Sequence, residues 1–194
     1  MTPMLNEPKV RARVVTIFFA FAFIVFSPLP VEVFLHPGLP EFMYTIPFYL
    51  FLVLLLVHTY HAVHCFKTVA PTQQRTAHVI DAILVLLYLA LPMSLWYGSF
   101  FYLVATLLFA VASLKYALLF GQTSAGALVR KKLIVDIIGI LGCLIAFIGD
   151  TLGFWPVTDW IFAIGFAGVT IYLFYIEPLY VLPHDHGQPQ RRPS

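Results

Sequence analysis

Six long apolar runs limit what this chain can fold into. They cover about Val14–Leu35, Phe42–His64, Ala77–Tyr97, Phe100–Phe120, Lys132–Ile148 and Thr158–Val181. A helix needs about 20 predominantly apolar residues to cross a bilayer, and most of these runs reach that length. Only 10% of the residues are charged, against about a quarter in a typical soluble domain. The sequence therefore predicts an all-α, polytopic integral membrane protein with six transmembrane helices in a lipid bilayer.

The basic residues lie in alternate connections between these runs. They precede the first run, lie between the second and third and before the fifth, and end the chain: Lys9, Arg11, Arg13, Lys67, Arg75, Arg130, Lys131, Lys132, Arg191 and Arg192. The segments "HPGLPE", "YGS" and "GDTLGFWPV" contain no Lys or Arg. The positive-inside rule then places both termini in the cytoplasm, with three helical hairpins in the plasma membrane (the inner membrane of a bacterium).

This topology divides the chain into three parts. We expect a basic cytoplasmic N-terminus over residues 1–13, a transmembrane domain over 14–182 and a disordered, polar cytoplasmic tail over 183–194. The net charge of +2 is small, and no basic cluster with interleaved aromatic residues indicates nucleic-acid binding. No serine stands in a G-x-S-x-G turn beside a plausible base, so a nucleophilic enzyme is not favoured.

Three histidines end the second run in the stretch "LVHTYHAVHCF". His58, His61 and His64 are three residues apart and share one part of a helix circumference. Zinc takes four N, S or O ligands, which His58, His61, His78 and Asp81 could supply if the second and third helices pack together. A b-type haem would need axial ligands from facing helices. The alternatives are metal at His58, His61 and His78, haem, an ion path, or polar residues at a helix end.

Ionisable residues within apolar runs are candidates for function. We predict that four of them lie near the cytoplasmic face, either along an ion path or as buried charges: Asp81, Lys115, Asp136 and Glu177. Lys115 and Asp136 lie on consecutive helices at similar depth, so we expect them to meet. A structural explanation stays open beside this one. Asp81 and Asp136 would lie about one turn inside their helices, where the dipole favours negative charge, and Lys115 could extend toward the interface.

The layout resembles the bacterial relatives of the lysosomal potassium channel called transmembrane protein 175. The corresponding residues are Arg13, Glu32, His64, Asp81, Pro92 at the end of "LALP" and Pro183 at the end of "PLYVLP". The resemblance implies a six-helix cation channel without a re-entrant filter loop. This chain departs from the family on the first helix, where Ile17, Phe18 and Phe19 replace a Phe-Ser-Asp signature.

A second, local resemblance covers "SAGALVRKKLIVDIIGILG" to "GFWPVTDWIFAIG". It is similar to the fifth and sixth helices of cation diffusion facilitators, whose metal site uses His-x-x-x-Asp; here the positions are Lys132 and Asp136. From charges and resemblances together we expect passage of a small cation, K⁺ or H⁺, by a homo-oligomer or a membrane-complex subunit. The alternative is a non-transporting metal-binding, haem-binding or scaffold subunit.

Overall fold

The computed structural model describes residues 15–20, 22, 39–69, 75–120, 126–176 and 179, and within these ranges the chain forms helices and no β-strand. The long helices are α3 (Leu39–Val69), α4 (Arg75–Ser94), α5 (Phe100–Leu119), α6 (Gly126–Thr151) and α7 (Trp155–Ile171). A 3-10 turn, η2 (Leu95–Tyr97), extends α4, and a π-helical turn, η3 (Tyr172–Ile176), extends α7. The predicted all-α class is therefore confirmed.

Four of the described helices are long and apolar enough to cross a membrane. These spans are Thr45–Phe66, Phe100–Leu118, Gly126–Thr151 and Val157–Ile176, and His78–Ser94 is a shorter apolar helix. Residues 15–20 and 22 of the first predicted helix are helical, and the rest of that helix lies outside the described residues. Many large apolar side chains on the outside of the bundle are exposed, for example Ile137, Leu141 and Ile145 on α6. An apolar exterior of this kind suits contact with lipid.

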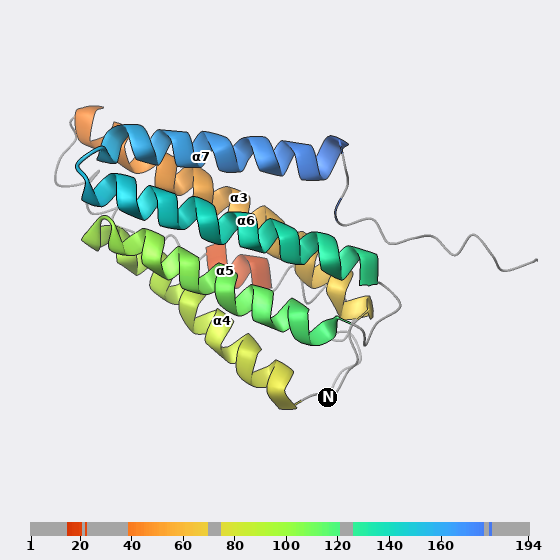
Figure 1. The fold of residues 1–194 in the computed structure, drawn as a ribbon. Helices are drawn as coiled ribbons and strands as arrows, with labels where there is room; N and C mark the ends of the chain where they lie inside the picture. Colours follow the sequence, from red (N-terminus) through yellow and green to blue (C-terminus); the bar gives the residue numbers. More distant parts are fainter. Residues whose placement is uncertain are drawn as a thin grey trace, which may run out of the picture.

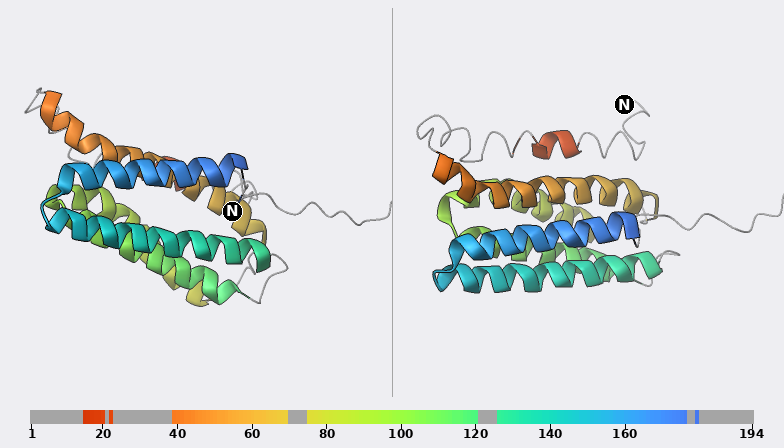
Figure 2. Two further views of the ribbon diagram at one scale, coloured as in Figure 1. Left: turned by 45° about the horizontal axis from the view of Figure 1, so that its top comes forward. Right: turned by 90° about the horizontal axis from the view of Figure 1, so that it is seen from above.

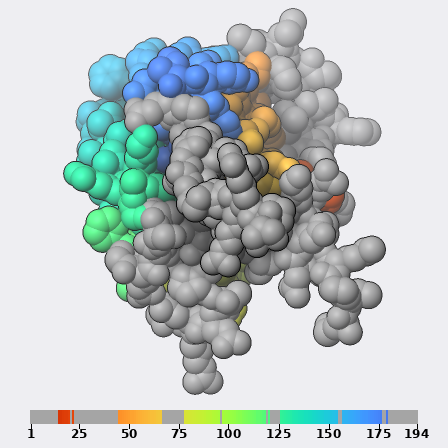
Figure 3. All heavy atoms as spheres, turned by 90° about the vertical axis from the view of Figure 1, so that its right-hand side faces the viewer, coloured from red at the N-terminus to blue at the C-terminus, as the bar shows by residue number. Residues whose placement is uncertain are grey.

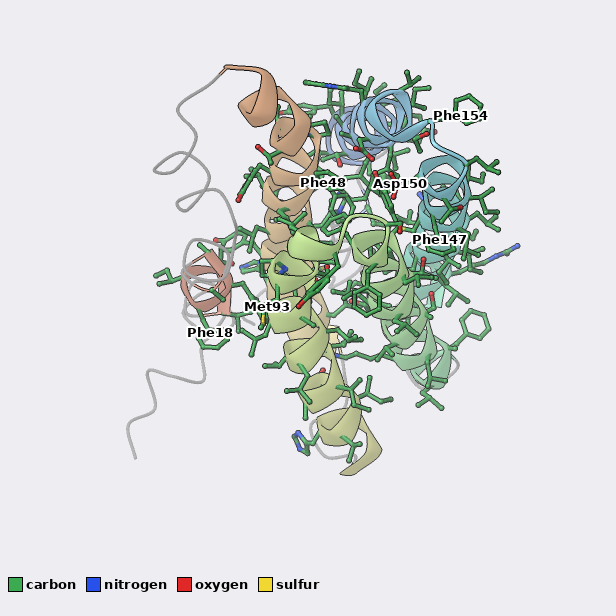
Figure 4. The ribbon with its side chains drawn as sticks, turned by 90° about the vertical axis from the view of Figure 1, so that its left-hand side faces the viewer. Phe18, Phe48, Met93, Phe147, Asp150 and Phe154 are labelled. Atoms are coloured by element: carbon green, nitrogen blue, oxygen red, sulfur yellow. The ribbon has the colours of Figure 1, made fainter. Side chains whose placement is uncertain are left out.

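The long helices form one bundle in which consecutive helices run antiparallel (Figure 1). Helix α4 contacts α5, α5 contacts α6, α6 contacts α7, and α7 contacts α3. The helical residues 15–20 lie outside α3 and α4 (Figure 2, Figure 4), and the ring of Phe19 is centred 4.4 Å from that of Tyr88 on α4. The helices thus surround a common interior, in which α3 and α4 are neighbours mainly through side chains.

Aromatic rings fill the interior toward one end of the bundle. Phe51 of α3 is 0% exposed. Its ring centroid lies 5.6 Å from that of Phe101 on α5, 5.0 Å from that of Phe162 on α7 and 4.7 Å from that of Phe166 on α7. Tilted and edge-to-face arrangements at these distances are favourable for aromatic pairs. This cluster fixes α3 against α5 and α7.

Helix α6 begins earlier than its apolar run predicts. The expected start was Lys132, whereas α6 starts at Gly126. Leu128 and Val129 are buried while Arg130 and Lys131 are exposed, so the basic residues occupy the outer face of a helix that already has an inner, apolar face. At roughly 1.5 Å per residue, Asp136 lies about 15 Å from the helix start. The helix dipole acts mainly within the first turn and therefore does not account for a carboxylate at this depth.

Helices α6 and α7 approach closely beside the turn that joins them. A Cβ atom added at Gly149 would lie 2.6 Å from Oγ1 and 2.9 Å from Cγ2 of Thr158. The turn itself contains Gly153 at φ +88°, a conformation that L side chains rarely adopt. Gly149 is therefore required by the contact between the helices, whereas Gly153 is required by the backbone of the turn.

We expect Gly149→Ala to destabilise the protein by about 1–3 kcal/mol, because the new methyl group overpacks the contact with Thr158. The matched control is Gly168→Ala on α7, where an added Cβ meets nothing within 4 Å; it should be neutral or slightly stabilising. Thermal melts of both variants in detergent measure the difference. Recovery of the loss in Gly149→Ala/Thr158→Ala would show that the contact is the cause, and equal melting of the two single variants would contradict it.

Candidate functional site

A cavity of about 630 Å³ lies between the helices and is partly open to the outside, because its lining includes exposed side chains such as Ile145 and Ile161. Its apolar part is lined by side chains that include Leu108, Phe109, Phe162 and Phe166. Its polar part is lined by His58, Thr59, His78, Asp81, Tyr88, Lys115, Lys132 and Asp136. The polar residues come from the C-terminal halves of α3 and α5, from α4 and from the N-terminal half of α6. The C-terminal end of α3 and the N-terminal end of α6 lie on the side of the bundle viewed in Figure 3. We call this space the polar cavity.

Lys132 and Asp136 form the most deeply buried ion pair of the polar cavity. They are one helical turn apart on α6, and the ammonium of Lys132 donates a hydrogen bond to Oδ1 of Asp136. Asp136 is 0% exposed and Lys132 is 8% exposed. The Lys132 ammonium also lies 5.3 Å from the ring centroid of Tyr116, a distance at which a cation and an aromatic face attract each other. Both charges are therefore held within the apolar bundle.

The second carboxylate oxygen of Asp136 has a different environment. Oδ2 is buried, and among the groups that the structure describes it has no hydrogen-bond partner. A buried acceptor without a partner costs about 1–3 kcal/mol, and more when it carries charge. Asp136 is among the residues that line the polar cavity, so a proton or a hydrogen-bond donor in that cavity comes near its carboxylate.

A second ion pair joins α4 to α5 at the polar cavity. The ammonium of Lys115 donates a hydrogen bond of 2.5 Å to Oδ1 of Asp81. These side chains are 27% and 41% exposed, respectively, so this pair is more open than the one on α6. The expected meeting of Lys115 with Asp136 is therefore wrong, since each residue has another partner. Lys132, which the apolar run placed at the very start of its helix, takes the position expected for Lys115.

Two uncharged contacts continue the polar lining across the bundle. The Nε2 atom of His58 on α3 lies 3.1 Å from Oγ1 of Thr170 on α7. The hydroxyl groups of Thr59 on α3 and Tyr88 on α4 are 2.5 Å apart. Together with the ion pairs, these contacts bring polar side chains from α3, α4, α5, α6 and α7 into one region of the bundle.

The histidines do not form the predicted four-ligand site. Within the described ranges, no three His, Cys, Asp or Glu side chains gather where they could hold a metal ion. His58 and His61 instead lie against the ring of Phe174, at centroid distances of 5.1 and 4.7 Å. His64 stacks on Tyr60, and His78 is exposed near the start of α4. The spacing did predict a common helix face, but aromatic rings rather than further ligands occupy that face. Glu177 lies outside the described residues.

A polar contact at the opposite end of the bundle was not predicted. The hydroxyl of Tyr102 on α5 donates a 2.5 Å hydrogen bond to Oδ1 of Asp159 on α7, and both residues are buried. Figure 4 looks along the bundle from this end: Asp150 lies on the inner side, whereas Phe154 projects outward from the turn between α6 and α7. A tyrosine in an apolar run gives no sequence signal of this kind, because its pairing depends on which helices become neighbours.

Within the described residues, fold and site together form an apolar, helical bundle suited to a membrane, with paired charges around a cavity between the helices. Comparison of the chain with protein-family models, curated proteins and solved structures finds no match. The arrangement of its own residues is therefore the basis for inferring what the protein does.

Proposed function

We propose that this chain is an integral membrane protein that carries a small cation, specifically a proton, through the polar cavity. The observation that carries the proposal is Asp136, a fully buried carboxylate inside an apolar helix, one oxygen of which has no hydrogen-bond partner among the described residues. Ionisable groups within membrane spans commonly belong to ion pathways and proton relays. A carboxylate can accept a proton and later return it.

The lysines favour a proton over K⁺ as the transported cation. Asp81 and Asp136 each already accept a hydrogen bond from an ammonium group. A metal cation would have to displace that ammonium or bind beside it, and like charges in a low-dielectric interior repel strongly. A proton adds to a carboxylate without needing space for a coordination shell. The hydroxyl and imidazole groups of Thr59, Tyr88 and His58 provide further sites for proton exchange around the cavity.

The proposal includes a topology and an assembly. Both termini are cytoplasmic in the plasma membrane, and six transmembrane helices include the first apolar run. The support for this orientation is the alternation of basic and non-basic connections. The polar cavity then lies toward the cytoplasmic face. A homo-oligomer, or a complex with other membrane subunits, would supply the helix contacts that the apolar exterior leaves available.

Proteoliposomes with an internal pH dye test the proposal directly. A K⁺ diffusion potential set by valinomycin should drive proton flux through wild-type protein well above the leak of protein-free liposomes. The double variant Lys132→Met/Asp136→Leu removes the buried pair without leaving a lone charge, so it should fold and show only the leak rate. Asp150→Asn, at the opposite end of α6, serves as the matched control and should retain flux.

Two results would overturn this function. The first is wild-type protein whose proton flux equals the leak of protein-free liposomes. The second is a double variant that conducts as well as wild type, since Asp136 would then have no part in the path. Uptake of radioactive Rb⁺, measured on the same proteoliposome preparation without valinomycin, separates a proton path from a K⁺ path: we expect no uptake above that of protein-free liposomes.

A further inference from the structure

The polar cavity is larger than proton passage requires. A water molecule occupies about 30 Å³ of liquid volume, and pockets that bind small organic molecules measure about 300–1,000 Å³. The volume of about 630 Å³ lies within the second range. Such pockets are mostly apolar with a few placed polar groups, which is how the lining of this cavity is composed.

The lining has two chemically distinct parts. The rings of Phe109, Phe162 and Phe166 and the side chain of Leu108 form apolar wall. This wall suits a hydrocarbon body, because apolar surface there makes dispersion contacts without leaving polar groups unpaired. The polar part contains the Lys132–Asp136 pair and the Asp81–Lys115 pair, two positive and two negative charges in balance. A charged ligand would upset this balance within the apolar bundle, so an uncharged head group fits better.

The hydrogen bonding of Asp136 determines which kind of polar group the head group must carry. Its Oδ1 accepts the hydrogen bond from Lys132, while its buried Oδ2 has no partner among the described groups. An ionised carboxylate is an acceptor only, so the missing partner is a donor. A hydroxyl group meets both requirements, since it donates a hydrogen bond and carries no charge. An ether or a ketone of the same shape provides no donor.

We propose that the polar cavity binds an uncharged amphiphile whose hydroxyl group donates to Oδ2 of Asp136 and whose hydrocarbon body lies along the apolar wall. The volume of the cavity and the hydrogen bonding of Asp136 support this site whether or not the protein conducts ions. A protein that binds such a molecule and moves no protons would contradict the proposed function alone. A protein that moves protons and binds no amphiphile would contradict this inference alone.

Dodecanol and dodecyl methyl ether are a matched pair of probes, because they share the chain and the oxygen but only dodecanol has a donor. Binding of radiolabelled dodecanol is measured on the full-length protein in nanodiscs, with empty nanodiscs as background. We expect saturable binding, and we expect the ether to compete about tenfold more weakly or worse, since a hydrogen bond to a charged group is lost.

Two glycine variants test whether the polar cavity is the site. Gly142 lines the cavity, and a Cβ there would contact Phe162 at 3.8 Å without a clash; Gly142→Leu should fill the space and abolish saturable binding. Gly168→Leu is the control, because Gly168 is exposed on α7 and its added Cβ meets nothing within 4 Å; binding should be unchanged. Equal competition by alcohol and ether, no saturable binding, or undiminished binding in Gly142→Leu would overturn the proposal.

Discussion

Lys132→Met should destabilise the protein by about 3–5 kcal/mol, the cost of leaving one member of a buried ion pair without its partner. Asp136 is fully buried and accepts its hydrogen bond from Lys132, so the variant leaves an uncompensated carboxylate inside the bundle. Unfolding in a graded denaturing detergent measures the loss. Arg130→Met is the matched control, because Arg130 is a nearby basic residue of the same helix and is exposed; its effect should stay within about 0.5 kcal/mol.

The double variant decides whether pairing is the cause. Removing both charges in Lys132→Met/Asp136→Leu should recover most of the stability, since a buried pair often contributes little more than apolar side chains of similar volume. The expected signature is a coupling energy of the size found for residues in direct contact, about 0.5–3 kcal/mol. Losses that simply add would show that each side chain acts alone. Lys115→Met should cost less than Lys132→Met, because Asp81 is the more exposed partner.

Phe51→Ala should cost about 3 kcal/mol, near the lower end of the range for removing a buried aromatic ring. The ring contacts Phe101, Phe162 and Phe166, so its removal leaves a void between α3, α5 and α7. We expect the lower end of this range because, in lipid, removing the ring loses packing contacts more than it loses free energy of transfer out of water.

Val53→Ala is the control for Phe51→Ala. Val53 is on the same helix but is 55% exposed, so truncation there should change stability little. Both variants are compared by thermal melting in nanodiscs. A loss at Val53 as large as that at Phe51 would show that α3 is not anchored through the aromatic cluster.

The sequence predicts the helices well because their cause is local. Apolar runs of membrane length form helices wherever they are, and four of the six predicted runs correspond to helices of spanning length. Helix ends were harder to predict. The run alone placed the start of α6 at Lys132, whereas buried Leu128 and Val129 carry the helix back to Gly126. Their burial depends on the neighbouring helices and therefore on tertiary packing.

The difference between local and tertiary causes also explains which features of the site were predicted. The ionisable residues were singled out by their presence in apolar sequence. The structure places His58, His78, Asp81, Lys115 and Asp136 around one cavity, and their part in an ion path stays a prediction. Their partners were not predicted, because helix order in space decides which side chains meet. One signal was available: Lys132 and Asp136 are four residues apart, the spacing of neighbours on a helix face. Because Lys132 was predicted to be the first residue of its helix, this spacing was not interpreted as an ion pair.

The pairing of the buried charges has a consequence for biogenesis. Inserting a helix into a membrane costs about 2.5–3.5 kcal/mol of free energy for each lone charge at its centre, on insertion scales. Lys132 and Asp136 neutralise each other within α6, so this helix carries its counter-ion with it. Asp81 and Lys115 lie on α4 and α5, which only η2 and two turn residues separate. Each of these four charges thus finds its partner within a single helix or a pair of consecutive helices. A chain that enters a bilayer helix by helix would therefore not have to wait for a distant segment to neutralise them.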